Sequence, residues 1–197
     1  MRTAALEVLY GGLDVAADVS QQARSRLQRV VSLLADEIVA PGDVAAMDKE
    51  SDNTILFLSG SHGGLTVTKP RTRIIGQPGA TFERLVTVDA DDVVFVGCSF
   101  QSVAGSNNEG QAVLVTSDAK CSFVDCRFRK PDTMAGDFVT VQNGGKAHFV
   151  LPRFGPANSS GGNCVNNAGA ALDVNLIGLV NSTGLANVNV TVFGQYT

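Results

Sequence analysis

The sequence is poor in the residues that build metal sites, sugar-binding platforms and membrane spans. Its 197 residues include no tryptophan, two tyrosines, two histidines and four cysteines. No two cysteines have the C-x-x-C spacing of a zinc site, so we predict no metal site, no cofactor and free buried thiols. The scarcity of Trp and Tyr argues against an aromatic-lined sugar groove. No apolar run approaches the roughly 18 residues that a membrane span needs.

The net charge and the N-terminal residues indicate which partners and which compartment to expect. The formal net charge of −4 gives no support for nucleic acid or an anionic membrane as a partner. The first residues lack the apolar core of a signal peptide, and unpaired cysteines suit a reducing compartment. We therefore expect assembly in the cytoplasm. A chain of this length can form one domain and bury about 70% of its unfolded surface.

What the sequence does contain is a repeated phrase. The segment 95–100 (FVGCSF) returns as 123–128 (FVDCRF) and 149–154 (FVLPRF), at steps of 28 and 26 residues. A repeat of this size is one supersecondary unit that buries its apolar face against a like neighbour. Short alternating runs of Val, Phe, Leu and Thr, broken by Gly, Asn, Asp and Ser, indicate strands and turns with no room for helices. The sequence predicts a mainly β fold, a parallel β-helix of about five coils of roughly 26 residues.

In such a coil, residues at the same place in successive repeats stack on one another. The predicted core ladder consists of Phe95, Cys98, Phe100, Phe123, Cys126, Phe128, Phe149 and Phe154. A β-sandwich or jelly roll has a similar composition and is the alternative fold. Neither of these needs the same phrase at the same period, so the repeat favours the β-helix.

The residues before the repeats carry a family resemblance. Segment 54–60 (TILFLSG) is a strand ending in Gly, 63–67 (GGLTV) a second strand, and 72–82 (TRIIGQPGATF) contains an I-x-G-type third strand. This order resembles the opening coil of pectate-lyase-like right-handed β-helices, and the resemblance extends to about residue 154. It implies the fold, whereas a shared fold alone does not imply a shared activity.

The N-terminal third has a different pattern. Residues 13–39 predict one amphipathic helix that ends at Pro41-Gly42. Its apolar face consists of Val19, Ala23, Leu27, Val30, Leu34 and Ile38. We expect 1–53 to form an arm and this helix, and 54–197 to form the β-helix. The helix would cover the open end of the solenoid or dock on a partner protein.

The C-terminal segment has almost no charge, because Asp173 is the only charged residue from 154 to 197. Such a segment is either a flexible low-complexity tail or a surface buried against other chains. The alternation over 188–193 favours the second interpretation. The candidate trimer interface consists of Val188, Val190, Val192 and Phe193.

The candidate catalytic acids form one cluster, Asp89-Ala90-Asp91-Asp92, in a predicted turn where Asp is common. Glycoside hydrolysis needs two carboxylates across a groove. The motifs of polygalacturonases are absent, and His62 and His148 fall in different coils, with His148 predicted to face outward. We therefore expect no catalytic residues and a protein that is not an enzyme.

The predicted combination of a short trimeric β-helix with an N-terminal helix and arm resembles virion proteins of tailed bacteriophages. The most similar group is the capsid cement or decoration trimers, followed by tailspike and fibre proteins. The first resemblance implies a homotrimer on the capsid surface of the virion, where it binds the major capsid protein and stabilises the shell. The second implies a module that recognises host glycan. A small polysaccharide lyase or hydrolase is the third hypothesis.

Overall fold

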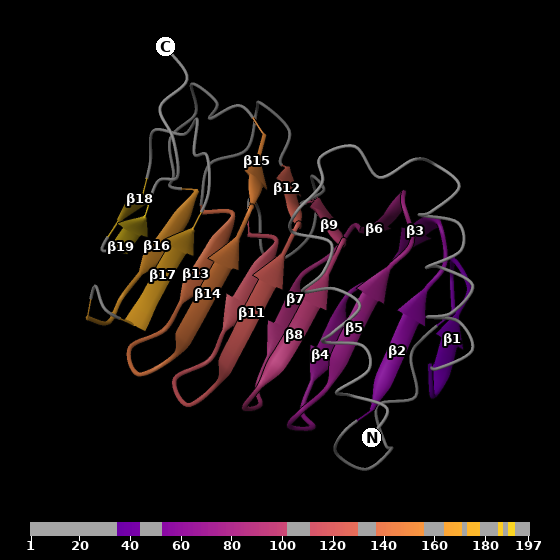
Figure 1. Ribbon diagram of the computed structural model, residues 1–197, viewed down its shortest axis with the longest axis horizontal. Helices are drawn as coiled ribbons and strands as arrows, with labels where there is room; N and C mark the ends of the chain where they lie inside the picture. Colours follow the sequence, from indigo (N-terminus) through magenta and orange to yellow (C-terminus); the bar gives the residue numbers. More distant parts are fainter. Residues whose placement is uncertain are drawn as a thin grey trace.

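The described part of the chain is wound into three parallel β-sheets around one core. The computed structural model describes residues 35–43, 53–101, 111–129, 137–155, 164–170, 173–177, 185–186 and 189–191. All strand pairs recorded within these residues are parallel, and neighbours in each sheet belong to successive turns of the chain. This arrangement confirms the predicted parallel β-helix (Figure 1).

Sheet A is the largest of the three, and its strands lie side by side across one face of the molecule in Figure 1. In order along the sheet its strands are β1 (Glu37–Val39), β2 (Thr54–Phe57), β5 (Arg73–Gly76), β8 (Val93–Val96), β11 (Lys120–Val124), β14 (Lys146–Val150), β17 (Val174–Ile177) and β19 (Asn189–Thr191).

Sheets B and C complete each coil. Sheet B contains β3 (Gly60–His62), β6 (Ala80–Phe82), β9 (Ser99–Gln101), β12 (Arg127–Arg129) and β15 (Arg153–Phe154). Sheet C contains β4 (Leu65–Val67), β7 (Val86–Val88), β10 (Val113–Val115), β13 (Val139–Val141), β16 (Val165–Asn167) and β18 (Leu185–Ala186). In β4, β7, β10, β13 and β16 the first and third residues are buried and the middle one is not, as the period of two predicts.

The core is built from columns of like residues, one per strand position. In sheet A, Phe95, Phe123 and Phe149 are register partners and stack in sequence, with centroids 5.2 and 5.1 Å apart. A second column runs along sheet B and meets the first edge to face. Its members are Phe82, Phe100, Phe128 and Phe154. The predicted ladder residues therefore lie in these columns, together with the buried Cys98 and Cys126.

The tight turn from sheet A to sheet B requires one residue in the left-handed region. That residue is Gly97, Asp125 and Leu151 in three successive coils, with φ of 67°, 48° and 51°. Glycine adopts this conformation without strain and Asp tolerates it, whereas a leucine is strained there. The repeated phrase thus keeps one backbone conformation although its third residue varies.

The coil length is not uniform along the solenoid. Ile55, Ile74 and Phe95 are partners along sheet A at steps of 19 and 21 residues, shorter than the predicted 26. The shorter coils come before the repeated phrase. The repeat length of the three phrases therefore overestimates the number of residues in the first coils.

The predicted helix over 13–39 is wrong at its C-terminal end. Residues 37–39 form β1, which pairs with β2, and Ile38 is 53% exposed instead of lying in a helix face. The edge of β2 supplies hydrogen-bond partners, such as Leu58 N–H to the Val39 carbonyl at 2.9 Å, and β-branched Ile38 and Val39 suit a strand. Val19, Ala23, Leu27, Val30 and Leu34 lie outside the described residues.

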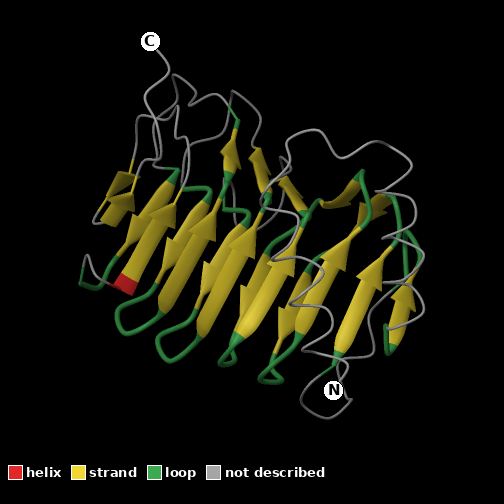
Figure 2. Ribbon diagram, in the orientation of Figure 1, coloured by secondary structure: helices red, strands yellow, loops and turns green. Residues whose placement is uncertain are grey.

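The described residues contain no α-helix, and the short red segment before β17 in Figure 2 is the single 3₁₀ residue Asp173. Consequently, no helix among them has the length and apolar character required to cross a membrane. The division of the chain at residues 53 and 54 stays a prediction, although β1 on its N-terminal side belongs to sheet A.

Candidate functional site

The acidic turn between β7 and β8 joins neighbouring coils instead of forming a paired-carboxylate site. Each carboxylate contacts a different side chain. Asp89 accepts a hydrogen bond from Thr116 at 2.6 Å, Asp91 pairs with Lys120 at 3.2 Å and Asp92 pairs with Arg73 at 3.1 Å. A fourth cross-coil contact, the ion pair between Lys146 and Asp173 at 3.4 Å, extends this series along the edge of sheet A. These acids therefore act as separate cross-coil contacts.

The two histidines have different environments. His62 is 3% exposed, its Nε2 lies 2.7 Å from the Leu58 carbonyl oxygen, and its ring packs edge-on against Phe57 at 5.0 Å. His62 is therefore a core residue of the first coil. His148 is exposed on β14, which confirms its predicted outward position.

No group of three or more His, Cys, Asp or Glu side chains that could hold a metal ion occurs among the described residues. All four cysteines are buried, and none of them forms a disulfide bond. Burial raises the pKa of the Cys121 thiol, and burial together with the Cys98 neighbour raises the pKa of Cys126. The thiolate form that metals and electrophiles require is therefore disfavoured at both positions.

The outer face of sheet A carries an unusual row of apolar side chains. These residues are register partners from β1 to β17, and we call them the aliphatic row: Ile38, Leu56, Ile75, Val96, Val124, Val150 and Ile177. Leu56 and Ile75 are 1% and 4% exposed, and they pack with the partly buried Ala35, Leu58 and Val96. The later members are half-buried on the surface. An outer row of this kind departs from the polar-out pattern of a solvated sheet.

A second outer row on sheet A is mostly polar. Arg73, Val94, Ser122, His148 and Asn175 occupy neighbouring register positions. Asn175 Nδ2 lies 3.5 Å from His148 Nδ1, and Ser122 is the register partner of His148 on the other side. Hydroxyl, imidazole and amide are the residue types of a nucleophile, a base and an orienting group. Ser122, His148 and Asn175 follow one another in this order along the sheet. The 3.5 Å distance between His148 and Asn175 is at the upper limit for a hydrogen bond.

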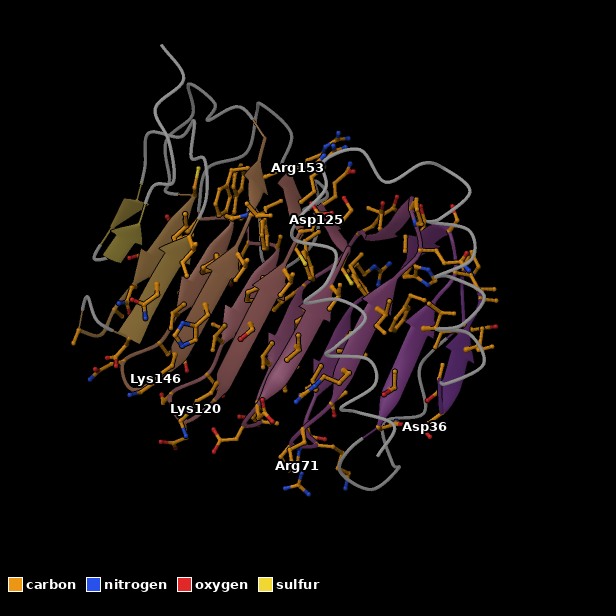
Figure 3. All side chains as sticks on the ribbon, viewed as in Figure 1. Asp36, Arg71, Lys120, Asp125, Lys146 and Arg153 are labelled. Atoms are coloured by element: carbon orange, nitrogen blue, oxygen red, sulfur yellow. The ribbon has the colours of Figure 1, made fainter. Side chains whose placement is uncertain are left out.

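The outer face of sheet B carries the third row, which we call the sheet B outer row. Its register partners are Ser61, Thr81, Ser99, Arg127 and Arg153. Arg153 Nη2 lies 3.1 Å from Asp125 Oδ1. Figure 3 shows this pair at the end of the sheet A strands opposite to that of Lys120 and Lys146.

The candidate trimer interface falls mostly beyond the described residues. Val190 lies in β19, where it is the register partner of Leu176. Val188, Val192 and Phe193 lie outside the described residues. The trimer interface stays a prediction.

No protein-family model and no curated protein matches the sequence. Solved structures with a similar fold are pectin methylesterases. One, a mutant in complex with a hexasaccharide, has 11% identity and a TM-score of 0.51, covering 80% of this chain and 66% of its own. Pectin methylesterase PemA from Erwinia chrysanthemi has 13% identity and a TM-score of 0.50, covering 73% and 64%. A third, in complex with another hexasaccharide, has 11% identity and a TM-score of 0.52, covering 81% and 67%.

These comparisons show the fold, which in pectin methylesterases is a right-handed parallel β-helix. This chain spans just under two thirds of the length of the first two, 66% and 64%. The expectation that the chain is not an enzyme is corrected, because the fold is shared with enzymes. That expectation depended on motifs and aromatic platforms of polysaccharide-cleaving enzymes, and their absence does not exclude other chemistry on the same scaffold. The resemblance to phage virion proteins stays a prediction.

Proposed function

We propose that this chain is a structural virion protein, a homotrimeric decoration protein that binds the major capsid protein on the outside of a phage shell. The aliphatic row is the observation that carries the proposal. Its later members, Val96, Val124, Val150 and Ile177, are half-buried and repeat at the strand spacing of about 4.8 Å, so they form an apolar stripe on the outer face of sheet A. Monomeric proteins rarely expose such contiguous patches, and a closed cyclic assembly buries the same stripe on every subunit.

The scaffold suits a mechanical role. The stacked phenylalanine columns run through successive coils, and the pairs Arg73–Asp92, Lys120–Asp91 and Lys146–Asp173 connect coils at the surface. A closely packed core resists compression. Such a rod would clamp neighbouring capsid subunits against the pressure of packaged DNA.

The assembly step is tested by light scattering on two variants of strand β14. Val150→Lys places a charge in the aliphatic row and is expected to convert the trimer to monomer. His148→Lys places the same charge on the same strand and face, outside the row, and serves as the control. A monomeric wild-type protein, or equal behaviour of the two variants, would remove the support for this interface.

The capsid role is tested on particles. Particles that lack this protein are expected to lose resistance to heat or osmotic shock, and adding the purified protein back should restore it. The Val150→Lys variant should fail to restore resistance. Unchanged resistance of the deficient particles would contradict a decoration function, whatever the oligomeric state.

A second function, recognition of host glycan by a tail fibre or spike, is favoured by the hexasaccharides bound to two of the similar structures. In that case the purified protein should adsorb to host cells or compete with phage adsorption.

Catalysis on the same scaffold is tested by methanol release from methylated pectin. Release that is lost in both Ser122→Ala and His148→Ala would assign ester hydrolysis to the polar row of sheet A.

A further inference from the structure

The sheet B outer row places two guanidinium groups on neighbouring strands. Arg127 and Arg153 are register partners on β12 and β15, so their backbones are one strand spacing apart, about 4.8 Å. Like charges directly opposite each other destabilise a sheet. The pair therefore costs stability unless an anion lies between the two side chains.

A second pair of cations in register shows how this chain neutralises such a contact. Lys120 and Lys146 are also register partners, but Lys120 lies 3.2 Å from Asp91 and Lys146 lies 3.4 Å from Asp173. Each lysine has its own carboxylate. This pair carries no excess charge and provides a matched comparison for the arginines.

The arginine pair lacks that balance. Among the described residues, the one carboxylate paired with either arginine is Asp125, which lies 3.1 Å from Arg153. Arg129, exposed on the same strand as Arg127, adds another positive charge. The patch is thus positive in a chain whose net charge is −4.

The ion pair between Arg153 and Asp125 leaves the guanidinium available to a ligand. Their side chains are 62% and 56% exposed. Exposed ion pairs contribute little to stability and are screened by water and salt. An incoming carboxylate can therefore compete with Asp125, and the planar guanidinium fork binds carboxylates through two parallel hydrogen bonds.

Hydroxyl groups continue the row beyond the arginines. Ser99 is the register partner of Arg127, and Thr81 is that of Ser99. At the far end of the row, the Ser61 hydroxyl donates to Glu83 at 2.6 Å. A linear ligand along the solenoid axis would thus meet hydroxyls first and guanidinium groups second. Sugars with carboxylates present both kinds of partner, whereas an acidic peptide has no comparable series of hydroxyls.

From this arrangement we propose that the sheet B outer row binds a carboxylate-bearing glycan. A uronate carboxylate lies between Arg127 and Arg153, and the hydroxyls of the adjoining sugar contact Ser99. The site is separate from the aliphatic row of sheet A. It would therefore operate whether or not the chain decorates a capsid.

Calorimetric titration of the full-length protein with an alginate hexasaccharide tests this site. We expect binding that weakens as salt increases, and a loss of about tenfold or more in Arg127→Gln/Arg153→Gln. The control is Lys120→Gln/Lys146→Gln, which removes the same charge from the other in-register pair and should bind like the wild type. Melting curves of both double variants establish that each is folded.

Several outcomes would overturn the proposal. No binding by the wild type would remove it. An equal loss in the two double variants would mean a general charge effect. Equal binding of neutral maltohexaose would exclude the carboxylate as the recognised group, and equal binding of a hexaglutamate peptide would exclude a glycan-specific site.

Discussion

The ring of Phe128 lies nearly parallel to that of Phe100, with centroids 5.1 Å apart and planes 12° from parallel. This separation is close to the spacing of neighbouring strands, about 4.8 Å, so backbone pairing and ring stacking impose the same coil register. Phe128 stacks at the same distance on Phe154 and meets Phe123 edge to face. It therefore connects three coils and both aromatic columns.

Replacing Phe128 by alanine should lower the free energy of unfolding by about 3–5 kcal/mol, because a fully buried ring leaves a cavity between coils. Urea denaturation followed by far-ultraviolet circular dichroism measures the loss. Arg129→Ala, on the same strand but exposed, is the control and should change stability by no more than about 0.5 kcal/mol. An unchanged midpoint for Phe128→Ala would contradict the coil register.

Gly145 and Gly63 provide a matched pair of turn glycines. A Cβ atom at Gly145 would lie 2.5 Å from the Thr116 carbonyl oxygen, whereas at Gly63 nothing lies within 4 Å. Gly145→Ala should therefore cost about 1–3 kcal/mol through overpacking against backbone of the preceding coil. Gly63→Ala should stay within about 1 kcal/mol of the wild type. Thermal melts measure the melting temperatures of the two variants. Equal melting temperatures would contradict this close packing at Gly145.

Leu151 holds the left-handed position that Gly97 and Asp125 hold in the preceding coils, and it is 47% exposed. That conformation destabilises an L-residue by roughly 1–2 kcal/mol, and glycine avoids this strain. Glycine also loses more backbone entropy on folding, which offsets about 0.5–1 kcal/mol of the gain. Leu151→Gly should therefore stabilise the protein by about 0.5–1 kcal/mol. Val150→Gly, one residue earlier in β14, should destabilise it. A destabilising Leu151→Gly would show that its side chain contributes more than the strain costs.

The repeated phrase was enough to predict the fold class, because each copy places its two phenylalanines at the same core positions. It was not enough for the first coils. His62 and Phe82 occupy the sheet B column there, yet the steps of 19 and 21 residues along sheet A hide their equivalence to later coils. The apolar spacing up to Ile38 fits a helix equally well, and only the free edge of β2 decides for a strand.

The outer rows were also present in the sequence, but alternation alone does not indicate their use. Val96, Val124 and Val150 are the second residue of each phrase, and a valine at an outward position departs from the polar pattern. Arg127 and Arg153 likewise share one position of the phrase. The sequence shows that these residues recur. Whether a carboxylate neutralises each cation depends on the conformation of the turns. Asp91 and Asp173 each pair with a lysine, whereas Asp125 pairs with Arg153.

The buried thiols predict how stability depends on pH. Burial raises the pKa of Cys121 and, with the neighbouring Cys98 as a further cause, that of Cys126, while thiols in the unfolded chain titrate near their ordinary value of about 8.5. Raised folded-state values mean that the full contribution to stability is present below that pH. It is lost as the pH rises above it, because the unfolded chain then releases protons that the folded chain retains.

Each of these two thiols should therefore reduce the free energy of unfolding by about 1.4 kcal/mol per pH unit above roughly pH 9. Urea titrations at intervals between pH 8 and 10 measure the slope. Cys121→Ala should have a slope shallower by about that amount, because one titrating group is gone while lysines and tyrosines titrate alike in both proteins. Equal slopes in wild type and variant would mean that Cys121 ionises in the folded protein, and hence that water reaches the core between Val93 and Ala147, its register partners.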